Sequence, residues 1–325
     1  MTRYLVTGAT GLIGSNIARL LLADGDDVRA LVRPGSDFEP LTAIGVEPFE
    51  GDITDKDDVV RAAEGCDAVI NSAAVLGGAA QQIDEQRATN ISGAHHVFDA
   101  GQAHGTRVVT LSTTTFFQHD TSLTEDSPVA AQWNDDPYTV TKGAAYQDAM
   151  RRVADEGADI VVVIPGGTFG PGVSVKRALG ATSYNRALRG ALNGKIPEYV
   201  SYPVPWVFAE DVAAASIAAA RHGKAGNKYL AFGVEDAQST AAWLNVACEV
   251  AGVPHRVEDV VIDPDDPEMV ARYGDTLVAL SQRRFPVPWF DNSRTRAELG
   301  YAPRPLREAM EITCDWLRRE GQIRD

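Results

Sequence analysis

Short apolar runs alternate with helical patterns through the first half of the chain. These runs are rich in Val, Ile and Leu, and they predict strands over Tyr4–Thr7, Val28–Val32, Val46–Glu50, Asp67–Asn71, Arg107–Leu111 and Ile160–Ile164. Such runs are typical of strands that are buried on both faces of a parallel sheet. Apolar residues at helical spacing predict a first helix over Ile13–Ala23. The alternation indicates βαβ units, and therefore an α/β fold with a doubly wound parallel sheet.

The alternation weakens after Gly172, where a second domain is expected to begin. Helical patterns in this part cover Tyr184–Leu192, Asp211–Arg221 and Leu306–Glu320. The second of these helices, within residues 206–225, is expected to pack back against the first sheet. We therefore predict a first domain of residues 1–172 together with that helix. A smaller C-terminal α/β domain is expected over residues 173–325, with a ligand cleft between the two.

Composition and charge narrow the class of protein. The chain has 325 residues, of which 44% are hydrophobic, and a formal net charge of −15. Nucleic acid and anionic membrane surfaces are poor partners for so acidic a chain. Cys66, Cys248 and Cys314 lie far apart without a metal-binding pattern, which favours buried thiols in a reducing compartment. No apolar run is long enough to span a membrane, and the early first strand leaves no room for a signal peptide. We therefore expect a cytoplasmic protein.

A glycine-rich segment joins the first strand to the first helix, with the sequence Thr7-Gly8-Ala9-Thr10-Gly11-Leu12-Ile13-Gly14. Gly8 permits a tight turn, Gly11 lets the backbone approach a pyrophosphate, and Gly14 lets the helix pack closely on the strand. The start of the helix offers free amides and a partial positive charge to phosphates. The spacing differs from the common G-x-G-x-x-G pattern. The strand–turn–helix context nevertheless favours a Rossmann-type dinucleotide site over a purely structural turn.

The residue after the second strand bears on the choice of cofactor. An NAD site usually has an acidic residue about 20 positions beyond the glycine turn, where it accepts hydrogen bonds from ribose hydroxyls. This chain has Arg33, followed by Pro34-Gly35-Ser36. Arginine pairs well with a 2′-phosphate, so we predict NADP, with Ser36 as a second donor and NAD as the alternative. The other interpretation of Arg33 is a solvated surface residue.

Tyr138 and Lys142 lie four positions apart, on one face of a predicted helix that begins near Pro137. A carbonyl that accepts hydride must also receive a proton, and free tyrosine has a pKa near 10, too high for ready exchange at neutral pH. A nearby ammonium stabilises tyrosinate, so Lys142 is expected to lower the pKa of Tyr138. A hydroxyl of the Ser112–Thr115 run can hold the carbonyl oxygen. The alternative is an ordinary pair on a surface helix.

Together these segments resemble the extended short-chain dehydrogenase/reductase family, whose members include NAD-dependent epimerases and dehydratases. The similarity covers nearly the whole chain. It is greatest to the dihydroflavonol reductase and 3β-hydroxysteroid dehydrogenase-like branch, because Arg33 and its Pro-Gly-Ser turn are similar to that branch. The segments that carry the resemblance are Thr7–Gly14, Gly51-Asp52, Asn71–Ala74, Ser112–Thr115, Tyr138-x-x-x-Lys142 and Pro165–Gly172.

The resemblance implies roles for individual residues. It makes Tyr138 the catalytic acid/base and Lys142 a ligand of the nicotinamide ribose. Thr114 aligns as the catalytic hydroxyl, with Thr113 close behind. The further cofactor contacts that it implies are Asp52 and Ile53 at the adenine, Ala73 and Ala74 along the cofactor, and Pro165 and Gly166 beside the nicotinamide. From the residues alone, a role of the Asp52–Asp55 segment in capping the following helix is equally favoured. The resemblance also implies a homodimer built on helices near 88–104 and 138–156.

These observations predict an NADP-dependent oxidoreductase that transfers a hydride between nicotinamide and a carbonyl or secondary alcohol. The alternatives are a nucleotide-sugar epimerase and a non-catalytic NADP-binding sensor. Arg33, where an epimerase usually has an acidic residue, argues against the first. The retained Tyr138 and Lys142 pair argues against the second.

The substrate is expected to be a small molecule, and an aromatic or apolar one is favoured by the aromatic residues near the predicted cleft. These are Phe116, Phe117, Trp133, Phe169, Tyr184, Tyr199, Tyr202, Trp206 and Phe208. Each is equally well explained as an ordinary core aromatic. Arg177, Arg186 and Arg189 can hold an anionic group, although a solvated helix face is the favoured interpretation of all three.

Overall fold

A seven-stranded parallel sheet forms the centre of the protein. The computed structural model describes residues 1–77, 83–132, 136–282 and 285–323. The strands of the sheet are β1 (Arg3–Thr7), β2 (Asp27–Val32), β3 (Glu47–Glu50), β4 (Ala68–Asn71), β5 (Arg107–Leu111), β6 (Ile160–Pro165) and β11 (Lys228–Ala231). Their order is β11-β6-β5-β4-β1-β2-β3, and every neighbouring pair is parallel. The chain winds outward from β1 to β3 and then returns to β4, which confirms the predicted doubly wound sheet.

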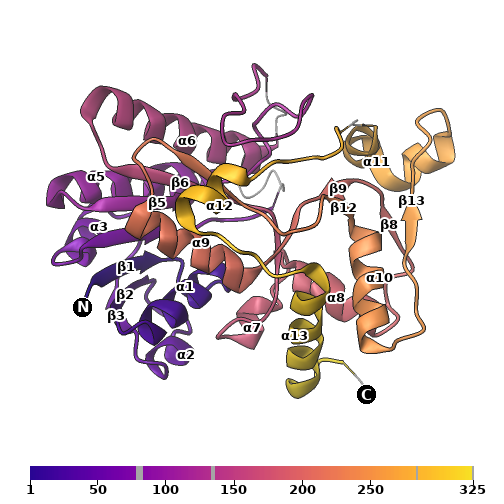
Figure 1. The fold of residues 1–325 in the computed structure, drawn as a ribbon, viewed down its shortest axis with the longest axis horizontal. Coiled ribbons are helices and arrows are strands. Elements are labelled where there is room, and N and C mark those ends of the chain that lie inside the picture. The colour runs from indigo at the N-terminus through magenta and orange to yellow at the C-terminus, as the bar shows by residue number, and fades with distance from the viewer. Residues whose placement is uncertain (78–82, 133–135, 283–284, 324–325) are drawn as a thin grey trace.

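Helices cover both faces of this sheet (Figure 1). They are α1 (Leu12–Ala23), α3 (Lys56–Ala63), α5 (Ala94–His104), α6 (Pro137–Glu156), α9 (Ala209–His222) and α12 (Ser293–Leu299). Successive residues of a strand point to opposite faces, so β1 contributes to two separate cores. Tyr4 and Val6 pack with apolar residues of α1 and α9, whereas Leu5 packs with those of α3, α5 and α6.

The remaining elements form a second, smaller α/β region at the right of Figure 1. Its helices are α7 (Val175–Ala178), α8 (Tyr184–Leu192), α10 (Thr240–Ala251), α11 (Pro267–Ser281) and α13 (Leu306–Arg319). Its strands pair two by two: β7 (Gly167–Phe169) with β10 (Trp206–Phe208), β9 (Pro203–Val204) with β12 (Gln238–Ser239), and β8 (Glu198–Val200) with β13 (Glu258–Val260). The indole rings of Trp206 and Trp243 stack with centroids 4.0 Å apart in its core.

The sheet uses parts of the chain that lie far apart in the sequence. Helix α9 packs against α1, and β11 follows α9 to become the edge strand beside β6. Helix α12 then adds Leu299 to the same core. The short helices α2 (Glu39–Thr42) and α4 (Ile83–Gln86) and the π-helical segment η2 (Arg87–Gly93) complete the first half of the chain.

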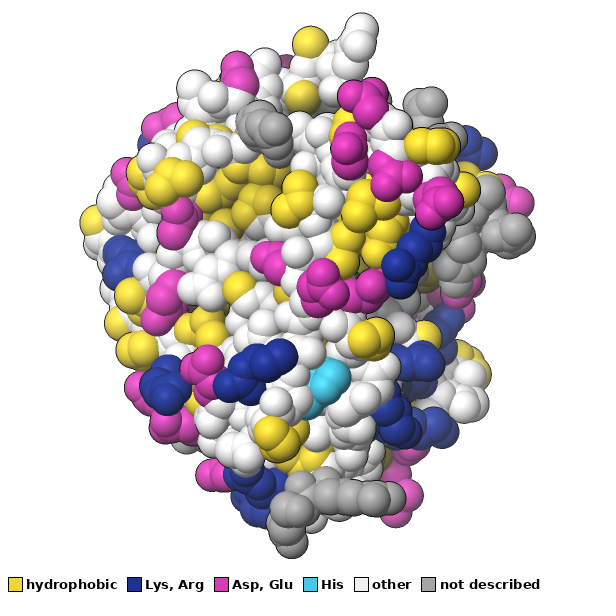
Figure 2. Space-filling model, turned by 90° about the vertical axis from the view of Figure 1, so that its right-hand side faces the viewer, with side chains coloured by type: hydrophobic (Ala, Val, Ile, Leu, Met, Phe, Trp, Pro, Cys, Tyr) yellow, Lys and Arg dark blue, Asp and Glu magenta, His cyan; other side chains and the backbone are white. Residues whose placement is uncertain are grey.

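The surface is mixed in character. On the face beside α10, α11 and β13, basic side chains lie mostly in the lower half, while acidic ones surround an apolar patch in the upper half (Figure 2). All three cysteines are buried and unbridged, as predicted for small apolar core residues. Within the described residues, no helix is both long and apolar enough to cross a membrane.

Candidate active site

The predicted site residues gather at one edge of the sheet. Thr7, Asn71 and Leu111 are the last residues of β1, β4 and β5, and the segments that follow them meet at the carboxyl ends of the strands. Parallel sheets of this kind bind their ligands at that edge, where the strand order reverses. The edge is tied together by buried polar groups. The Thr7 hydroxyl donates to Asn71 Oδ1 at 2.6 Å, and Asn71 Nδ2 donates to Thr110 Oγ1 at 3.2 Å.

The turn after β1 has no room for side chains at two of its glycines. Gly8 has a φ of +67°, and a Cβ placed on it would lie 2.6 Å from the backbone nitrogen of Ala73. A Cβ on Gly14 would lie 2.3 Å from the Gly8 carbonyl oxygen. No side chain caps α1 at Gly11, so the first amides of the helix, from residues 12–14, have no side-chain acceptor. The turn therefore fits the pyrophosphate of a dinucleotide.

Arg33 follows the end of β2 directly and is exposed. In the described part of the chain it has no ion-pair partner, so its guanidinium is available to a ligand. The turn after it is formed by Ser36, whose amide and hydroxyl both donate to the Arg33 carbonyl, at 3.0 and 2.7 Å. The Ser36 hydroxyl proton is thus held by the backbone. This arrangement fixes the turn that presents Arg33.

Asp52 begins the segment after β3, and its Oδ1 accepts from the amide and hydroxyl of Thr54, at 2.9 and 2.8 Å. The cap of α3 is Asp55, whose side chain accepts from two amides of the first turn. The capping role predicted for the Asp52–Asp55 segment is therefore confirmed, with Asp55 as the capping residue, and the adenine contact of Asp52 stays a prediction. Ile53 is buried and packs against Gly93 of η2.

Tyr138 stands in the first turn of α6. Asp136 caps this helix by accepting from the Thr139 amide at 2.8 Å, and Pro137 occupies the first helical position. Burial raises the pKa of Tyr138 to about 12, while a hydrogen bond with the Thr113 side chain opposes this rise. Of the two candidate threonines, Thr113 is therefore the one whose side chain acts on the Tyr138 hydroxyl. Thr114 instead uses its carbonyl oxygen, which accepts from the Phe117 amide at 3.1 Å.

Lys142 lies one helical turn beyond Tyr138 and is buried. Its Nζ donates to the Leu111 carbonyl oxygen at 2.6 Å, at the end of β5. Burial lowers the pKa of Lys142 to about 8. Lys142 was expected to lower the pKa of Tyr138, but that pKa is raised. Burial of the phenol has the largest effect, and the Lys142 ammonium is directed to the Leu111 carbonyl.

A small cavity with a volume of about 10 Å³ adjoins Lys142. That volume is about the space of one water molecule. Its lining includes Asn90, Ser112 and Lys142, and the buried Ser112 Oγ has no hydrogen-bond partner among the residues that the structure describes. Asn90, within η2, accepts from the Val75 amide at 2.9 Å and donates to the Thr141 hydroxyl at 3.2 Å. The sequence analysis did not single out Asn90, because an Asn inside a helix carries no distinctive pattern.

The buried ammonium of Lys142 predicts a pH dependence of stability. Its folded pKa of about 8 lies below the ordinary value of 10.5, so the charged form costs stability at neutral pH. The unfolding free energy recovers as the pH rises from about 8 to 10.5, because the unfolded chain then binds more protons than the folded one. Relative to Lys142→Met, the wild type should therefore gain on the order of 2–3 kcal/mol of unfolding free energy between about pH 7 and about pH 10.

Urea unfolding of both proteins at the two pH values measures this difference. Contributions from all other groups, Tyr138 included, are common to the two proteins and cancel. Parallel pH profiles for the wild type and Lys142→Met would contradict a charged Lys142 in a buried setting.

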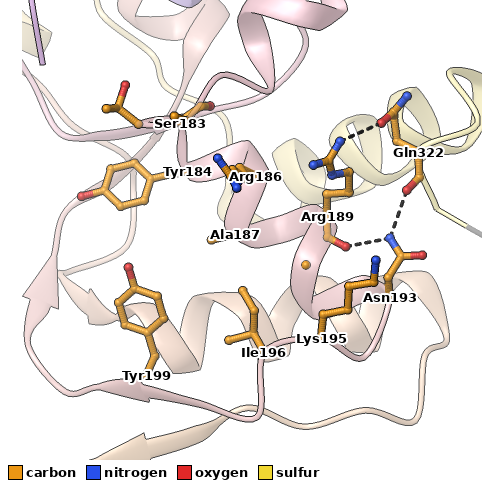
Figure 3. A pocket seen from close by; sticks show the side chains of 13 residues that line it. Ser183, Tyr184, Arg186, Ala187, Arg189, Asn193, Lys195, Ile196, Tyr199 and Gln322 are labelled. Atoms are coloured by element: carbon orange, nitrogen blue, oxygen red, sulfur yellow. Dashed lines mark hydrogen bonds between the residues drawn. The ribbon is translucent and has the colours of Figure 1, made fainter. Parts of the chain in front are cut away.

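A larger pocket of about 920 Å³ opens in the C-terminal region, between α8 and the segment after it (Figure 3). The rings of Tyr184 and Tyr199 lie at one end, and Arg189 and Lys195 lie at the other. Of the aromatic residues predicted near the cleft, Tyr184 and Tyr199 are the described ones that line this pocket. Five of the others belong to the cores, namely Phe116, Phe117, Phe169, Trp206 and Phe208, and Tyr202 packs against a core. Trp133 lies outside the described residues.

Fold and site together define a nucleotide-binding α/β protein with a Tyr–Lys pair at the cofactor edge of its sheet. The model of the NAD dependent epimerase/dehydratase family matches residues 4–233. The chain belongs to this family, and its predicted place among NAD(P)-dependent enzymes is confirmed.

Some of the similar proteins match nearly the whole chain, and others match about half of it. Sterol demethylase protein B of Methylococcus capsulatus is 28% identical, covering 98% of this chain and 99% of that protein. A 3β-hydroxysteroid dehydrogenase/Δ5→4-isomerase of Mycobacterium tuberculosis is 32% identical, and the match covers 52% of this chain and 48% of that protein. Matches to dihydroflavonol reductase-like proteins also occur, which confirms the predicted branch. The crystal structure of a nucleoside-diphosphate-sugar epimerase from Pseudomonas aeruginosa has the same fold, with a TM-score of 0.79, 22% identity and 99% coverage of both chains.

Proposed function

We propose that the protein is an NADP-dependent oxidoreductase that interconverts a carbonyl compound and its secondary alcohol. The observation that carries this proposal is that the Thr113 side chain acts on the Tyr138 hydroxyl, one helical turn before Lys142, which is bonded to the end of β5. A phenol and a second hydroxyl, placed together at the cofactor edge, are what a carbonyl oxygen needs in order to be held and protonated.

The chain's own residues supply the proton chemistry. A nicotinamide cofactor, when bound, supplies or accepts the hydride. Because its pKa is raised to about 12, Tyr138 is protonated at neutral pH and can donate its proton to a carbonyl oxygen. Thr113 orients that oxygen through its hydroxyl. Lys142 is mostly charged below about pH 8. Its ammonium is held at the end of β5 by the Leu111 carbonyl, where it would bind the ribose of the nicotinamide.

The preference for NADP rests on Arg33. An exposed guanidinium without an ion-pair partner, presented at the end of β2, suits a 2′-phosphate. A charge-assisted hydrogen bond contributes about 1.5–3 kcal/mol. Arg33→Asp should therefore lower the ratio of kcat/KM for NADPH over NADH by about 10- to 100-fold. Steady-state kinetics with both cofactors and one substrate measure this ratio.

Arg319→Asp is the matched control, because it changes the net charge equally at an exposed position near the end of α13. This variant should keep the wild-type ratio. An unchanged ratio in Arg33→Asp would show that Arg33 is an ordinary surface arginine, and would leave the oxidoreductase proposal intact with NAD as its cofactor.

A panel of carbonyl compounds tests the reaction class. Aldehydes, aryl ketones, steroid ketones and flavonoid-like ketones are each mixed with NADPH or NADH, and the absorbance of the reduced nicotinamide is followed. We expect oxidation of NADPH in proportion to the alcohol formed. A tightly bound cofactor that is carried through purification, with turnover of a nucleotide sugar and no net change in absorbance, would instead indicate an epimerase.

A further inference from the structure

The stretch of chain between Asp159 and Glu198 has an unusual charge pattern for so acidic a protein. It contains no Asp or Glu, but it has five basic residues: Lys176, Arg177, Arg186, Arg189 and Lys195. The chain as a whole has a net charge of −15. This stretch runs from β6 through α7 and α8, and it supplies most of the wall of the 920 Å³ pocket.

Three of these five cations line the pocket, and none of the described lining residues is acidic. Arg189 donates to the neutral side chain of Gln322 at 3.1 Å. Across the described ranges of the chain, Arg186 and Lys195 have no ion-pair partner. Asn193 braces the same end of the pocket, since its Nδ2 donates to the carbonyls of Arg189 and Gln322 at 2.7 and 3.0 Å. A concave site with positive charges and no counter-charge raises the local concentration of anions.

The other end of the pocket is aromatic and is formed by Tyr184 and Tyr199. Tyr184 packs edge-on against Trp206 with centroids 4.9 Å apart. Its pKa is raised, chiefly by burial and to a smaller degree by the charges of neighbouring phenols, among them Tyr199 and Tyr138. Trp206 in turn lies against Gly167, which follows the Pro165-Gly166 pair predicted to flank the nicotinamide. Figure 3 shows Arg186 between this aromatic end and the end formed by Arg189 and Lys195.

We propose that the pocket binds a carboxylate or phosphate group of the substrate through Arg186 and Lys195, while Tyr184 and Tyr199 contact its apolar part. The proposal rests on the proposed function, for which it names the substrate class: an apolar carbonyl compound that carries an anionic group. A neutral polycyclic ketone would leave both cations without a partner. The volume of the pocket lies in the range of small-molecule sites.

Binding of three related probes tests this proposal independently of turnover. 1-Naphthyl phosphate, 1-naphthoate and uncharged 1-naphthol are titrated by calorimetry into the full chain in the presence of NADP. We expect at least one of the two anions to bind about tenfold more tightly than 1-naphthol, and the double variant R186Q/K195Q to lose that advantage. The tighter anion identifies the group as phosphate or carboxylate. Because surface charges are screened by salt, the advantage should also fall at high ionic strength.

Two further variants make the outcomes separable. Arg177→Gln removes an exposed cation of α7 that does not line the pocket, and it should bind all three probes as the wild type does. Tyr138→Phe should likewise retain the preference for anions, so a failure of the catalytic assignment would leave this result standing. Anions that bind no more tightly than 1-naphthol, or equally well to R186Q/K195Q with an unchanged melting temperature, would overturn the proposal.

Discussion

Tyr138→Phe is expected to lower kcat by about 10²- to 10⁴-fold and to leave cofactor affinity nearly unchanged. The substitution keeps the ring, so the packing at the start of α6 is preserved, but it removes the proton that a carbonyl oxygen must receive. The same change removes the hydrogen bond with Thr113. Steady-state rates and fluorescence titration of NADPH, made on the same preparations, measure the two quantities.

Tyr273→Phe is the control for this experiment. The Tyr273 hydroxyl donates a hydrogen bond to Glu198 Oε1 at 2.8 Å within the C-terminal region. Loss of this hydroxyl should therefore leave kcat unaltered. Retained turnover in Tyr138→Phe would remove this residue from the chemistry. Loss of cofactor affinity together with turnover would instead indicate a binding role.

Thr113→Val is expected to lower kcat by about 10²- to 10³-fold, the usual cost of losing one donor to a developing oxyanion. Valine has nearly the same shape as threonine, so the buried position is preserved while the hydroxyl beside Tyr138 is lost. Thr114→Val is the matched comparison at the neighbouring position. It should retain most of its activity, because the hydrogen bonds that involve Thr114 in the structure use its backbone carbonyl.

The pair of threonine variants distinguishes two assignments. A large loss in Thr113→Val with little change in Thr114→Val supports the pairing observed in the structure. The reverse order would restore Thr114, to which the alignment with the family points, and would mean that the segment after β5 rearranges when the cofactor binds.

The fold was largely predictable because its signals are local. The strand predicted over Ile160–Ile164 consists entirely of β-branched residues, and the sheet buries it on both faces. The helix predicted over Tyr184–Leu192 has the same bounds in the structure, where Ser183 caps it. The edge strand β3, in contrast, is mostly exposed, because it has a neighbour on one side only.

The site was predictable where one residue type is required at one place. Gly8 and Gly14 are such positions, since a Cβ at either would meet backbone atoms within 3 Å. Thr113 and Thr114 could not be separated, because both are hydroxyls at the end of one strand and the backbone path decides which of them turns towards Tyr138. The pKa of Tyr138 was predicted with the wrong sign, because burial cannot be read from a spacing of four residues.

The surroundings of the basic residues of α8 could not be predicted from the sequence either. Arg186 and Arg189 were interpreted as a solvated face, because basic side chains on an amphipathic helix usually form one. Their placement around a pocket depends on the segment that carries Lys195 and Tyr199, which returns beside α8 and closes the far wall. That return is a tertiary feature without a signal in the helix itself.

The transfer of isotope from cofactor to product tests the central claim most directly. A carbonyl substrate identified in the panel is incubated with NADPH deuterated at C4 of the nicotinamide, and the alcohol is analysed by mass spectrometry. For the wild type, the account predicts one deuterium at the carbinol carbon of each product molecule formed, with matching NADP production. A product without deuterium, formed with no net oxidation of NADPH, would contradict it.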